Sequence, residues 1–263
     1  MVIEKYNLSK KYHKRIVHIS DIHYKNKKNL KNLYKILKVI KNLKPDYICI
    51  TGDIVDDKNI KDQQLLVDYI KDLSSICKIF ISLGNHEFYY NHHLEKSYDK
   101  SLFDKVDRLK NVYVLDNKIH SEFGINFIGI TLDNNYYDLE SESEFLYFMN
   151  KKIPRLDCKY NILLLHSPYR IVDKKTIENL KCKNNISLVL SGHMHAGLTF
   201  EWMKKILKGR GLVTPQKEFF KNYCYGMFKI NNYNVIITSG ITKLSNLKLF
   251  NYLYQSEITV IDI

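Results

Sequence analysis

Short apolar runs separated by helical periodicities occupy the first half of the chain. The runs predict buried strands at residues 16–20, 47–51 and 77–83. Between the first two runs, apolar residues recur at helical spacing with lysines on the opposite side, at Leu30, Leu33, Leu37 and Ile40. A second helix is predicted at residues 65–73. This β-α-β-α-β order predicts parallel strands joined by right-handed crossovers.

The second half of the chain is richer in predicted strands. They lie at residues 112–115, 125–131, 161–165, 187–190, 225–230, 234–239 and 257–263, with a helix at 139–150. Two facing mixed sheets with helices on their outer faces accommodate these elements, so the sequence predicts a four-layer α/β/β/α sandwich. No repeat, low-complexity spacer or shift in composition divides the 263 residues, which predicts a single domain spanning 1–263.

Polar clusters follow five of the predicted strands, at the point where each strand ends. The clusters are Asp21 with His23, Asp53 with Asp56, Asn85 with His86, His166, and His193 with His195. Ligands of a parallel sheet gather outside the carboxyl ends of its strands. One such cluster carries little weight, because Asn and Asp are also common in turns and helix caps. Five clusters at strand ends predict a common site.

The clustered side chains offer oxygen and imidazole ligands. This donor set suits manganese, iron or zinc and selects none of them. Asp53 is the best candidate for a bridge, because one carboxylate can hold two divalent ions about 3.5–4 Å apart, with a hydroxide nucleophile between them at neutral pH. His193 and His195 are two residues apart, so each can face a different ion.

The other histidines lack such placement. His18 lies inside a predicted strand, where we expect a packed side chain rather than a ligand. Surface positions are expected for the remaining four, His13, His92, His93 and His120.

The formal net charge of +13 would usually suggest a polyanionic partner. Only five of the 41 basic residues are arginine, however, and phosphate recognition favours arginine. The charge therefore favours a solvated basic surface over a track for nucleic acid, which stays the weaker alternative.

Cysteine usage and the N-terminal sequence bear on the compartment. The five cysteines are odd in number and show no CxxC spacing, which is typical of reduced thiols. The first 18 residues contain no apolar run long enough for a signal or membrane helix. The sequence thus predicts a cytoplasmic protein, with peripheral contact to a membrane left open.

The order of the motifs, DxH, GDxxD, GNHE, H and GHxH, resembles that of the calcineurin-like metallophosphoesterase superfamily. The resemblance implies that Asp21, His23, Asp53 and His195 hold one metal ion. It implies that Asp53, Asn85, His166 and His193 hold the other. By the same resemblance, His86 donates a proton to the leaving oxygen or stabilises it, and Asp56 orients His86.

Two comparisons with the motifs of the superfamily indicate which of its branches this sequence resembles. Its protein phosphatases carry arginines where this chain has Asp57 and Leu83, which argues against a protein phosphatase. The tail is similar to small bacterial phosphodiesterases of the YkuE/YaeI type in four places, at Pro215, Tyr225-Gly226-Met227-Phe228, Ser239-Gly240-Ile241 and Ser256-Glu257-Ile258. Those relatives usually read GHTHGG where residues 192–197 read GHMHAG.

These features favour a dinuclear metal-dependent phosphoesterase. We expect it to hydrolyse a phosphodiester or pyrophosphate bond, in a small molecule or a lipid, by means of a metal-bridging hydroxide. The preference over a monoester comes from family analogy alone. One alternative is a nuclease acting on DNA or RNA, and another is a non-catalytic scaffold of the same fold. No obligate protein partner is implied.

Residues 198–221 follow the last metal motif and are expected to form a lid or flap beside the site. Trp202, Met203, Ile206 and Leu207 share one face of a predicted short helix, with Lys204, Lys205 and Lys208 on the other. One interpretation is a flap whose apolar face packs on the domain. The other is an interfacial lid in which residues 202–210, including Arg210, contact an anionic membrane.

Overall fold

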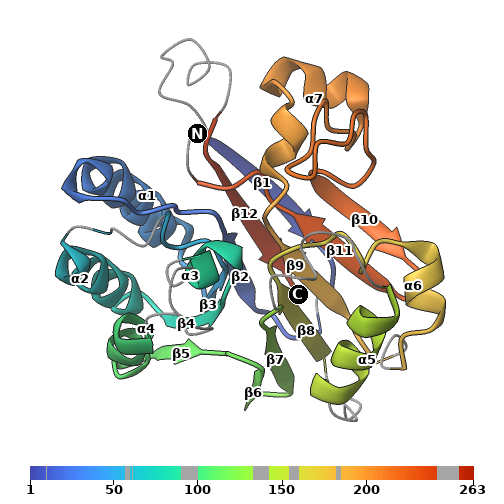
Figure 1. Ribbon diagram of the computed structural model, residues 1–263. Helices are drawn as coiled ribbons and strands as arrows, with labels where there is room; N and C mark the ends of the chain where they lie inside the picture. The colour runs from blue at the N-terminus through green and yellow to red at the C-terminus, as the bar shows by residue number, and fades with distance from the viewer. Residues whose placement is uncertain are drawn as a thin grey trace.

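Two six-stranded sheets lie face to face, with helices on their outer faces (Figure 1). This computed structural model describes residues 1–9, 11–56, 60, 62–89, 100–132, 142–153, 160–181, 185–241 and 255–263. The predicted four-layer α/β/β/α sandwich is confirmed.

The first sheet contains both the N-terminal and the C-terminal strand. Its order is β1 (Val2–Asn7), β12 (Glu257–Asp262), β2 (Arg15–Ile19), β3 (Tyr47–Thr51), β4 (Lys78–Ser82) and β5 (Val112–Val114). From β2 to β5 the strands are parallel, whereas β12 runs antiparallel to β2 and pairs in parallel with β1.

The second sheet is parallel in its centre and antiparallel at both edges. Its order is β10 (Gly226–Ile230), β11 (Tyr233–Ile237), β9 (Leu188–Ser191), β8 (Tyr160–Leu165), β7 (Ile125–Ile130) and β6 (Lys118–Glu122). The antiparallel pairs are β10 with β11 and β6 with β7.

Helices connect the parallel strands. The α-helices are α1 (Leu30–Leu43), α2 (Gln63–Ser74), α3 (Asn85–Tyr89), α4 (Lys100–Asp107), α5 (Glu142–Lys152), α6 (Lys174–Glu178) and α7 (Glu201–Leu207). Short 3₁₀ helices lie at η1 (Lys27–Asn29) and η3 (His195–Leu198). Among the described residues, no helix is long and apolar enough to cross a membrane.

Helix α1 shows how the apolar spacing becomes a packed face. Leu33, Ile36 and Ile40 are buried against the first sheet, one helical turn apart. The helix ends at Lys44, which adopts a left-handed conformation (φ 50°) directly before Pro45. The residue before a proline is disfavoured in the α conformation, so the sequence itself sets this boundary.

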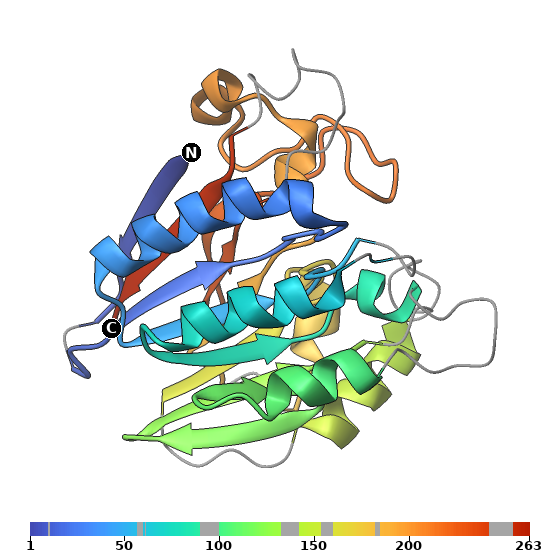
Figure 2. The same cartoon turned by 90° about the vertical axis from the view of Figure 1, so that its left-hand side faces the viewer.

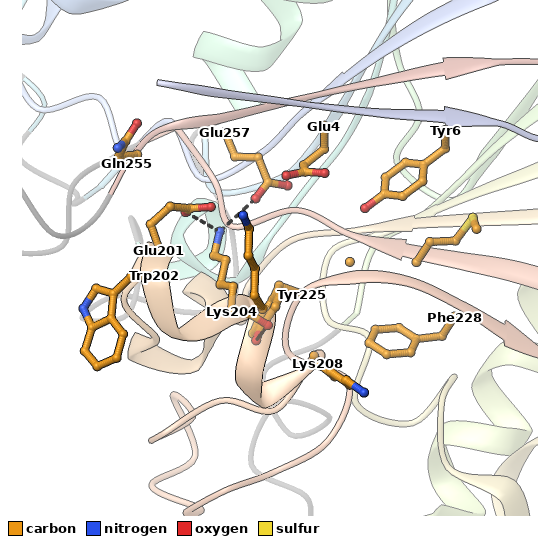
Figure 3. Close-up of a pocket in the computed structure, with 14 residues that line it drawn as sticks. Glu4, Tyr6, Glu201, Trp202, Lys204, Lys208, Tyr225, Phe228, Gln255 and Glu257 are labelled. Carbon is orange, nitrogen blue, oxygen red and sulfur yellow. Dashed lines mark hydrogen bonds and ion pairs between the residues drawn. The ribbon is translucent and has the colours of Figure 1, made fainter.

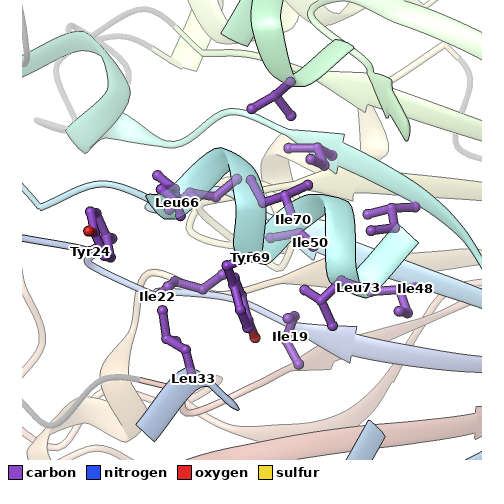
Figure 4. Packing of buried hydrophobic residues seen from close by; sticks show 14 of the residues in the cluster. Ile19, Ile22, Tyr24, Leu33, Ile48, Ile50, Leu66, Tyr69, Ile70 and Leu73 are labelled. Atoms are coloured by element: carbon purple, nitrogen blue, oxygen red, sulfur yellow. The ribbon is translucent and has the colours of Figure 1, made fainter. Parts of the chain in front are cut away.

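Three apolar layers hold the sandwich together. Helices α1, α2 and α4 cover the outer face of the first sheet (Figure 2), and Tyr69 and Leu73 of α2 reach Ile19 and Ile48 in this layer (Figure 4). A second layer fills the space between the second sheet and α5 and α6. Between the sheets, the ring of Phe80 on β4 stacks on that of Phe127 on β7, with centroids 3.8 Å apart.

The sequence pattern does not reveal the two strands β1 and β6. Along β1, half-buried and exposed residues alternate because it forms an edge of its sheet, and β6 at an edge of the other sheet has no fully buried residue. Helix α5 begins at Glu142, and the predicted start at 139 lies outside the described residues. The three described cysteines, Cys49, Cys77 and Cys224, are free thiols.

His18 is packed within β2, as its position in a strand predicts. The side chain is fully buried, and Nε2 lies 2.8 Å from the Thr51 hydroxyl of the neighbouring strand. Burial lowers the pKa of His18 to about 3, because the charged ring would lose its hydration. The imidazole is therefore neutral in the folded protein at neutral pH.

The burial of His18 predicts that part of the free energy of unfolding is lost as the pH falls. His18→Gln should not show this part of the loss. Below about pH 6.5 the unfolded chain binds a proton on His18, while the folded chain stays neutral there down to about pH 3. The stability advantage of wild type over His18→Gln should thus shrink by about 2 kcal/mol between pH 7.5 and pH 5. Urea unfolding at both pH values measures it, with exposed His13→Gln as the control. An advantage that stays constant would mean that folded His18 takes up the proton.

Candidate metal centre

Loops from both sheets converge at one end of the sandwich. The loops after β2, β3 and β4 carry Asp21, His23, Asp53 and Asn85, and those after β8 and β9 carry His166, His193 and His195. His166 Nε2 on the second sheet lies 3.1 Å from Asp53 Oδ2 on the first. His195 Nε2 lies 3.5 Å from Asp21 Oδ1. The carboxyl ends of the two sheets thus form a shared site.

The ligand atoms fall into three overlapping groups. Within each group, all of them lie within 4.8 Å of one another. The groups are Asp21 with His23 and His195, His23 with Asp53 and His86, and Asp53 with His166 and His193. Neighbouring groups share His23 or Asp53, so the cluster is continuous and long enough for two ions.

Asp53 occupies the middle of this cluster. Besides His166, its Oδ2 lies 3.8 Å from His23 Nε2 and 3.9 Å from His86 Nε2. Its other oxygen, Oδ1, accepts a hydrogen bond from the backbone N–H of His86 at 2.9 Å. A carboxylate with imidazoles from both sheets around it is suited to bridge two ions, as the sequence predicts.

The orientation of His166 fits metal binding. Its Nδ1 lies 2.6 Å from the backbone carbonyl oxygen of Thr51. A carbonyl only accepts hydrogen bonds, so the proton sits on Nδ1, and Nε2 is directed at Asp53 as the ligand atom.

Two buried polar atoms in the cluster also fit a metal ion. Asn85 is 8% exposed, and its Oδ1 makes no hydrogen bond with the described residues. His23 is 5% exposed, and its Nε2 likewise makes none. Leaving such atoms buried without a partner is costly. Metal ions coordinated by these two atoms would remove that cost.

The titration behaviour of the cluster follows from its charge and burial. Burial alone would lower the pKa of His166, but the Asp53 carboxylate outweighs it and raises the pKa to about 9. Burial would likewise raise the pKa of Asp53, but His166, His23 and His86 hold it far below its usual range. The site thus attracts positive charge, and divalent ions would displace these protons on binding.

Glu87 ties the loop after β3 to the turn after β4. Its carboxylate accepts hydrogen bonds from the backbone N–H groups of four residues, Asp53, Ile54, Val55 and Gly84. The side chain is 1% exposed. Burial and the neighbouring Asp53 charge raise the pKa of Glu87, while the N–H groups of Gly84 and Val55 act in the opposite direction. Sequence reasoning gave this residue no role, although its presence in the GNHE motif was a usable signal.

The backbone of the site is strained at its ligands. Five of them have left-handed backbone angles, namely Asp21, His23, Asp53, His193 and His195, with φ between 45° and 66°. This conformation costs a non-glycine residue about 1–3 kcal/mol. Backbone hydrogen bonds between the loops offset this cost. The N–H groups of Asp21 and His23 donate to the carbonyl oxygens of Gly52 and Asp53, at 3.1 and 2.9 Å respectively.

Asp56 contacts His86 in a different way from the one predicted. The backbone carbonyl oxygen of Asp56, and not its carboxylate, lies 2.6 Å from His86 Nδ1. The carboxylate instead lies 3.3 Å from His23 Nδ1 and 2.6 Å from Lys25 Nζ. Burial alone would raise the pKa of Asp56, but His23 and Lys25 lower it to about 2. The Asp56 side chain thus orients His23, while its main chain orients His86.

Gln216 is a further residue at the cluster that sequence reasoning missed. Its Nε2 lies 2.8 Å from Nε2 of His193. Gln216 belongs to the segment 198–221, so this contact places that segment beside the site. Its isolated position in a loop offered no signal in the sequence.

The histidines expected at the surface differ in their environments. His13 is exposed. His120 is half-buried, with Nε2 3.4 Å from Glu122 and its ring 4.1 Å from that of Tyr113. His92 and His93 lie outside the described residues, as does Asp57.

The family follows from a match that covers the site. The model of the family described as calcineurin-like phosphoesterase matches residues 14–197, a stretch that contains all seven candidate ligands. The chain belongs to the calcineurin-like phosphoesterase family. The predicted resemblance is therefore confirmed at the level of the family, and the likeness of the tail to the YkuE/YaeI type stays a prediction.

Two curated relatives of this family member are both named as uncharacterized metallophosphoesterases. One is an uncharacterized metallophosphoesterase of Campylobacter jejuni, 28% identical over 203 residues, which make up 76% of this chain and 48% of the relative. The other, an uncharacterized metallophosphoesterase of Helicobacter pylori, is 29% identical over 187 residues, which make up 71% of this chain and 45% of the relative. The chain thus spans about half the length of these relatives.

Solved structures with a similar course of the chain include two phosphatases. A dimetal phosphatase from Danio rerio superposes with a TM-score of 0.48 and 12% identity, over 87% of this chain and 88% of the other. A purple acid phosphatase from yellow lupin seeds gives a TM-score of 0.43 and 13% identity, over 69% of this chain and 38% of the other.

Family membership and the ligand groups together make two divalent metal ions the cofactors of this site. Oxygen and imidazole donors leave their identity open among manganese, iron and zinc.

Exchange of the central carboxylate should affect both ions. We expect Asp53→Asn to bind fewer than two ions and to lose metal affinity by more than tenfold, because Asp53 belongs to two of the three ligand groups. His195→Asn, which changes one group only, should retain one tightly bound ion. Metal analysis after dialysis measures both. An Asp53→Asn protein with two tightly bound ions would disprove the bridging role.

Glu87→Gln tests the link between the two loops. The amide lacks the negative charge and offers one acceptor oxygen to four N–H groups, so unfolding free energy should fall by about 1.5–3 kcal/mol. Metal affinity should fall as well, because Asp53 loses its support. Thermal or urea unfolding and metal titration measure the two effects, with Glu178→Gln, an exposed position on α6, as the control. Unchanged metal affinity in a destabilised Glu87→Gln protein would limit Glu87 to a structural role.

Proposed function

We propose that the protein is a dinuclear metal-dependent phosphohydrolase that cleaves a phosphodiester or pyrophosphate bond. The observation that carries this proposal is the position of Asp53, a buried carboxylate with ligand groups on both sides. When bound, two divalent ions supply Lewis-acid stabilisation of charge on the phosphoryl group and a nucleophile derived from water. The remaining chemistry belongs to the residues around them.

We assign His86 to the leaving group. The Asp56 carbonyl accepts from Nδ1, so the ring keeps a proton there, and Nε2 points toward Asp53 at 3.9 Å. To donate a proton from Nε2, the ring must therefore be doubly protonated.

Leu83 supports a preference for substrates other than phosphoproteins. It stands where protein phosphatases of the superfamily carry a phosphate-binding arginine, and it is fully buried among apolar residues of the first sheet. A phosphoryl group at this site is therefore held by the metal centre rather than by an arginine at that position.

A substrate comparison tests the proposed reaction. We expect protein reconstituted with manganese, iron or zinc to hydrolyse bis(p-nitrophenyl) phosphate and a nucleotide sugar faster than p-nitrophenyl phosphate. Asp53→Asn should lower turnover by at least about 10³-fold, as expected for loss of a main electrostatic element. Preferred cleavage of single-stranded DNA would favour the nuclease alternative. A protein that holds two ions and cleaves none of these substrates would favour the scaffold.

Removal of the His86 ring tests its role separately from metal binding. We expect His86→Asn to retain two ions and to lose about 10²–10⁴-fold in turnover, the range typical of a lost general acid. The loss should be largest for substrates with poor leaving groups, because these depend most on protonation. Loss of a metal ion would make His86 a ligand, and an equal loss for all leaving groups would exclude proton donation.

A further inference from the structure

We propose that residues 198–221 dock on an anionic lipid bilayer. In this position the metal centre would act on a phosphate ester at the membrane surface. The docking deepens the proposed function and rests on it only for the identity of the substrate, since membrane binding itself can be measured without catalysis.

Exposed apolar side chains are concentrated in this segment. Leu198 is 42% exposed, and four larger exposures follow at Trp202 (64%), Ile206 (70%), Phe219 (72%) and Phe220 (62%). Scattered exposed apolar residues are normal, whereas a concentration of this kind marks a contact surface. Figures 1 and 2 both draw α7 and the loop that follows it together at one end of the molecule, beyond the sheets.

The orientation of α7 leaves its large apolar residues in solvent. Lys204, which the sequence pattern places on the outer face, instead points inward to Glu201, Ser239 and Glu257, at 3.0, 2.8 and 3.3 Å. Figure 3 shows Lys204 with Glu201 and Glu257, and Trp202 directed away from them. Because Lys204 faces the domain, the helix presents Trp202 and Ile206 outward.

The contact between α7 and the rest of the protein is loose. No residue of α7 is buried, and the structure describes all seven. A cavity of about 650 Å³ lies between α7 and the strands β1 and β10 (Figure 3). Trp202, Lys205 and Lys208 line its rim while staying exposed, and Tyr6 on β1 and Phe228 on β10 also line it. A flap packed through its apolar face would bury Trp202 and Ile206, so this structure does not support the packed-flap interpretation.

The charge of the segment selects an anionic surface. Residues 198–221 contain six basic and two acidic residues, a net charge of +4. Four of the basic side chains are exposed and form no ion pair with a described carboxylate, namely Lys205, Lys208, Arg210 and Lys217. Tryptophan beside lysine and arginine suits the headgroup level of a bilayer, where the ring lies among the lipid headgroups and the cations meet phosphate.

The same segment reaches the metal centre. Gln216 contacts His193, so the exposed Phe219 and Phe220 lie three and four residues from a direct contact with a candidate ligand. A bilayer seated on the segment would therefore bring headgroup phosphates beside the site. A soluble substrate would not need this arrangement of exposed aromatic residues.

Co-sedimentation with vesicles tests the docking. The protein should bind phosphatidylcholine vesicles that contain phosphatidylglycerol, less so at high salt, and should bind pure phosphatidylcholine weakly. Trp202→Ala/Ile206→Ser should lower the partition coefficient about tenfold or more. Lys205→Gln/Lys208→Gln should lower it roughly 20- to 30-fold, about fivefold for each lysine near an anionic surface.

Two matched variants control for general effects. Lys35→Gln/Lys38→Gln removes two exposed lysines of α1 at the same spacing, and Phe123→Ser removes an aromatic side chain that is 77% exposed elsewhere. Both should bind vesicles like wild type. Circular dichroism of each variant checks that the fold is retained.

The outcomes separate the docking from the proposed reaction. Asp53→Asn should bind vesicles like wild type, because docking does not depend on the metal centre. If the wild-type protein hydrolyses none of the phosphodiester or pyrophosphate substrates but binds vesicles through residues 198–221, the proposed reaction is refuted and the docking stands. Absent vesicle binding, or binding that the segment variants and the controls change equally, would overturn the docking. Self-association in sedimentation velocity that Trp202→Ala/Ile206→Ser abolishes would also overturn it, because a second copy would then occupy the surface.

Discussion

The geometry of the site depends on one buried carboxylate placed between two sheets. Asp53 lies in the loop after β3 of the first sheet and faces His166, which follows β8 of the second. Neither sheet alone can complete the ligand set, so the apolar layer between them also fixes the distance between ligands. Glu87 adds a second constraint. Its carboxylate accepts charge-assisted hydrogen bonds from the backbone N–H groups of Asp53 and Ile54 and so fixes the backbone at Asp53.

The sequence predicted the central strands and the site for the same reason. In the sequence, a buried parallel strand is a continuous apolar run. The residues that follow each run lie at the same edge of the sheet. Asp21, Asp53 and Asn85 could therefore be assigned to a common site without knowledge of any distance. The second sheet, with His166 and His193, joined the prediction because its central strands follow the same rule.

Other features depend on contacts that no local pattern encodes. The edge strands β1 and β6 are half-buried, so their patterns resemble those of loops. Lys204 turns inward because Glu257 is nearby in space, although 53 residues separate them in the chain. The contact of His86 with the Asp56 carbonyl joins two loops that lie 30 residues apart in the chain. Spacing could suggest that these residues meet, but not through which atoms.

The position of β12 has a consequence for the order in which the protein assembles during synthesis. Residues 257–262 fill the gap between β1 and β2, and Val260 pairs with Val17 across 243 positions of the chain. Until residue 262 leaves the ribosome, β2 has an open edge, and the loop that carries Asp21 and His23 is attached to a sheet that lacks two strands. The second sheet and the β2–β5 unit can form earlier, since their strands and connections are synthesised first. The nascent protein thus gains its last structural support for the metal centre only after residue 262 has been synthesised.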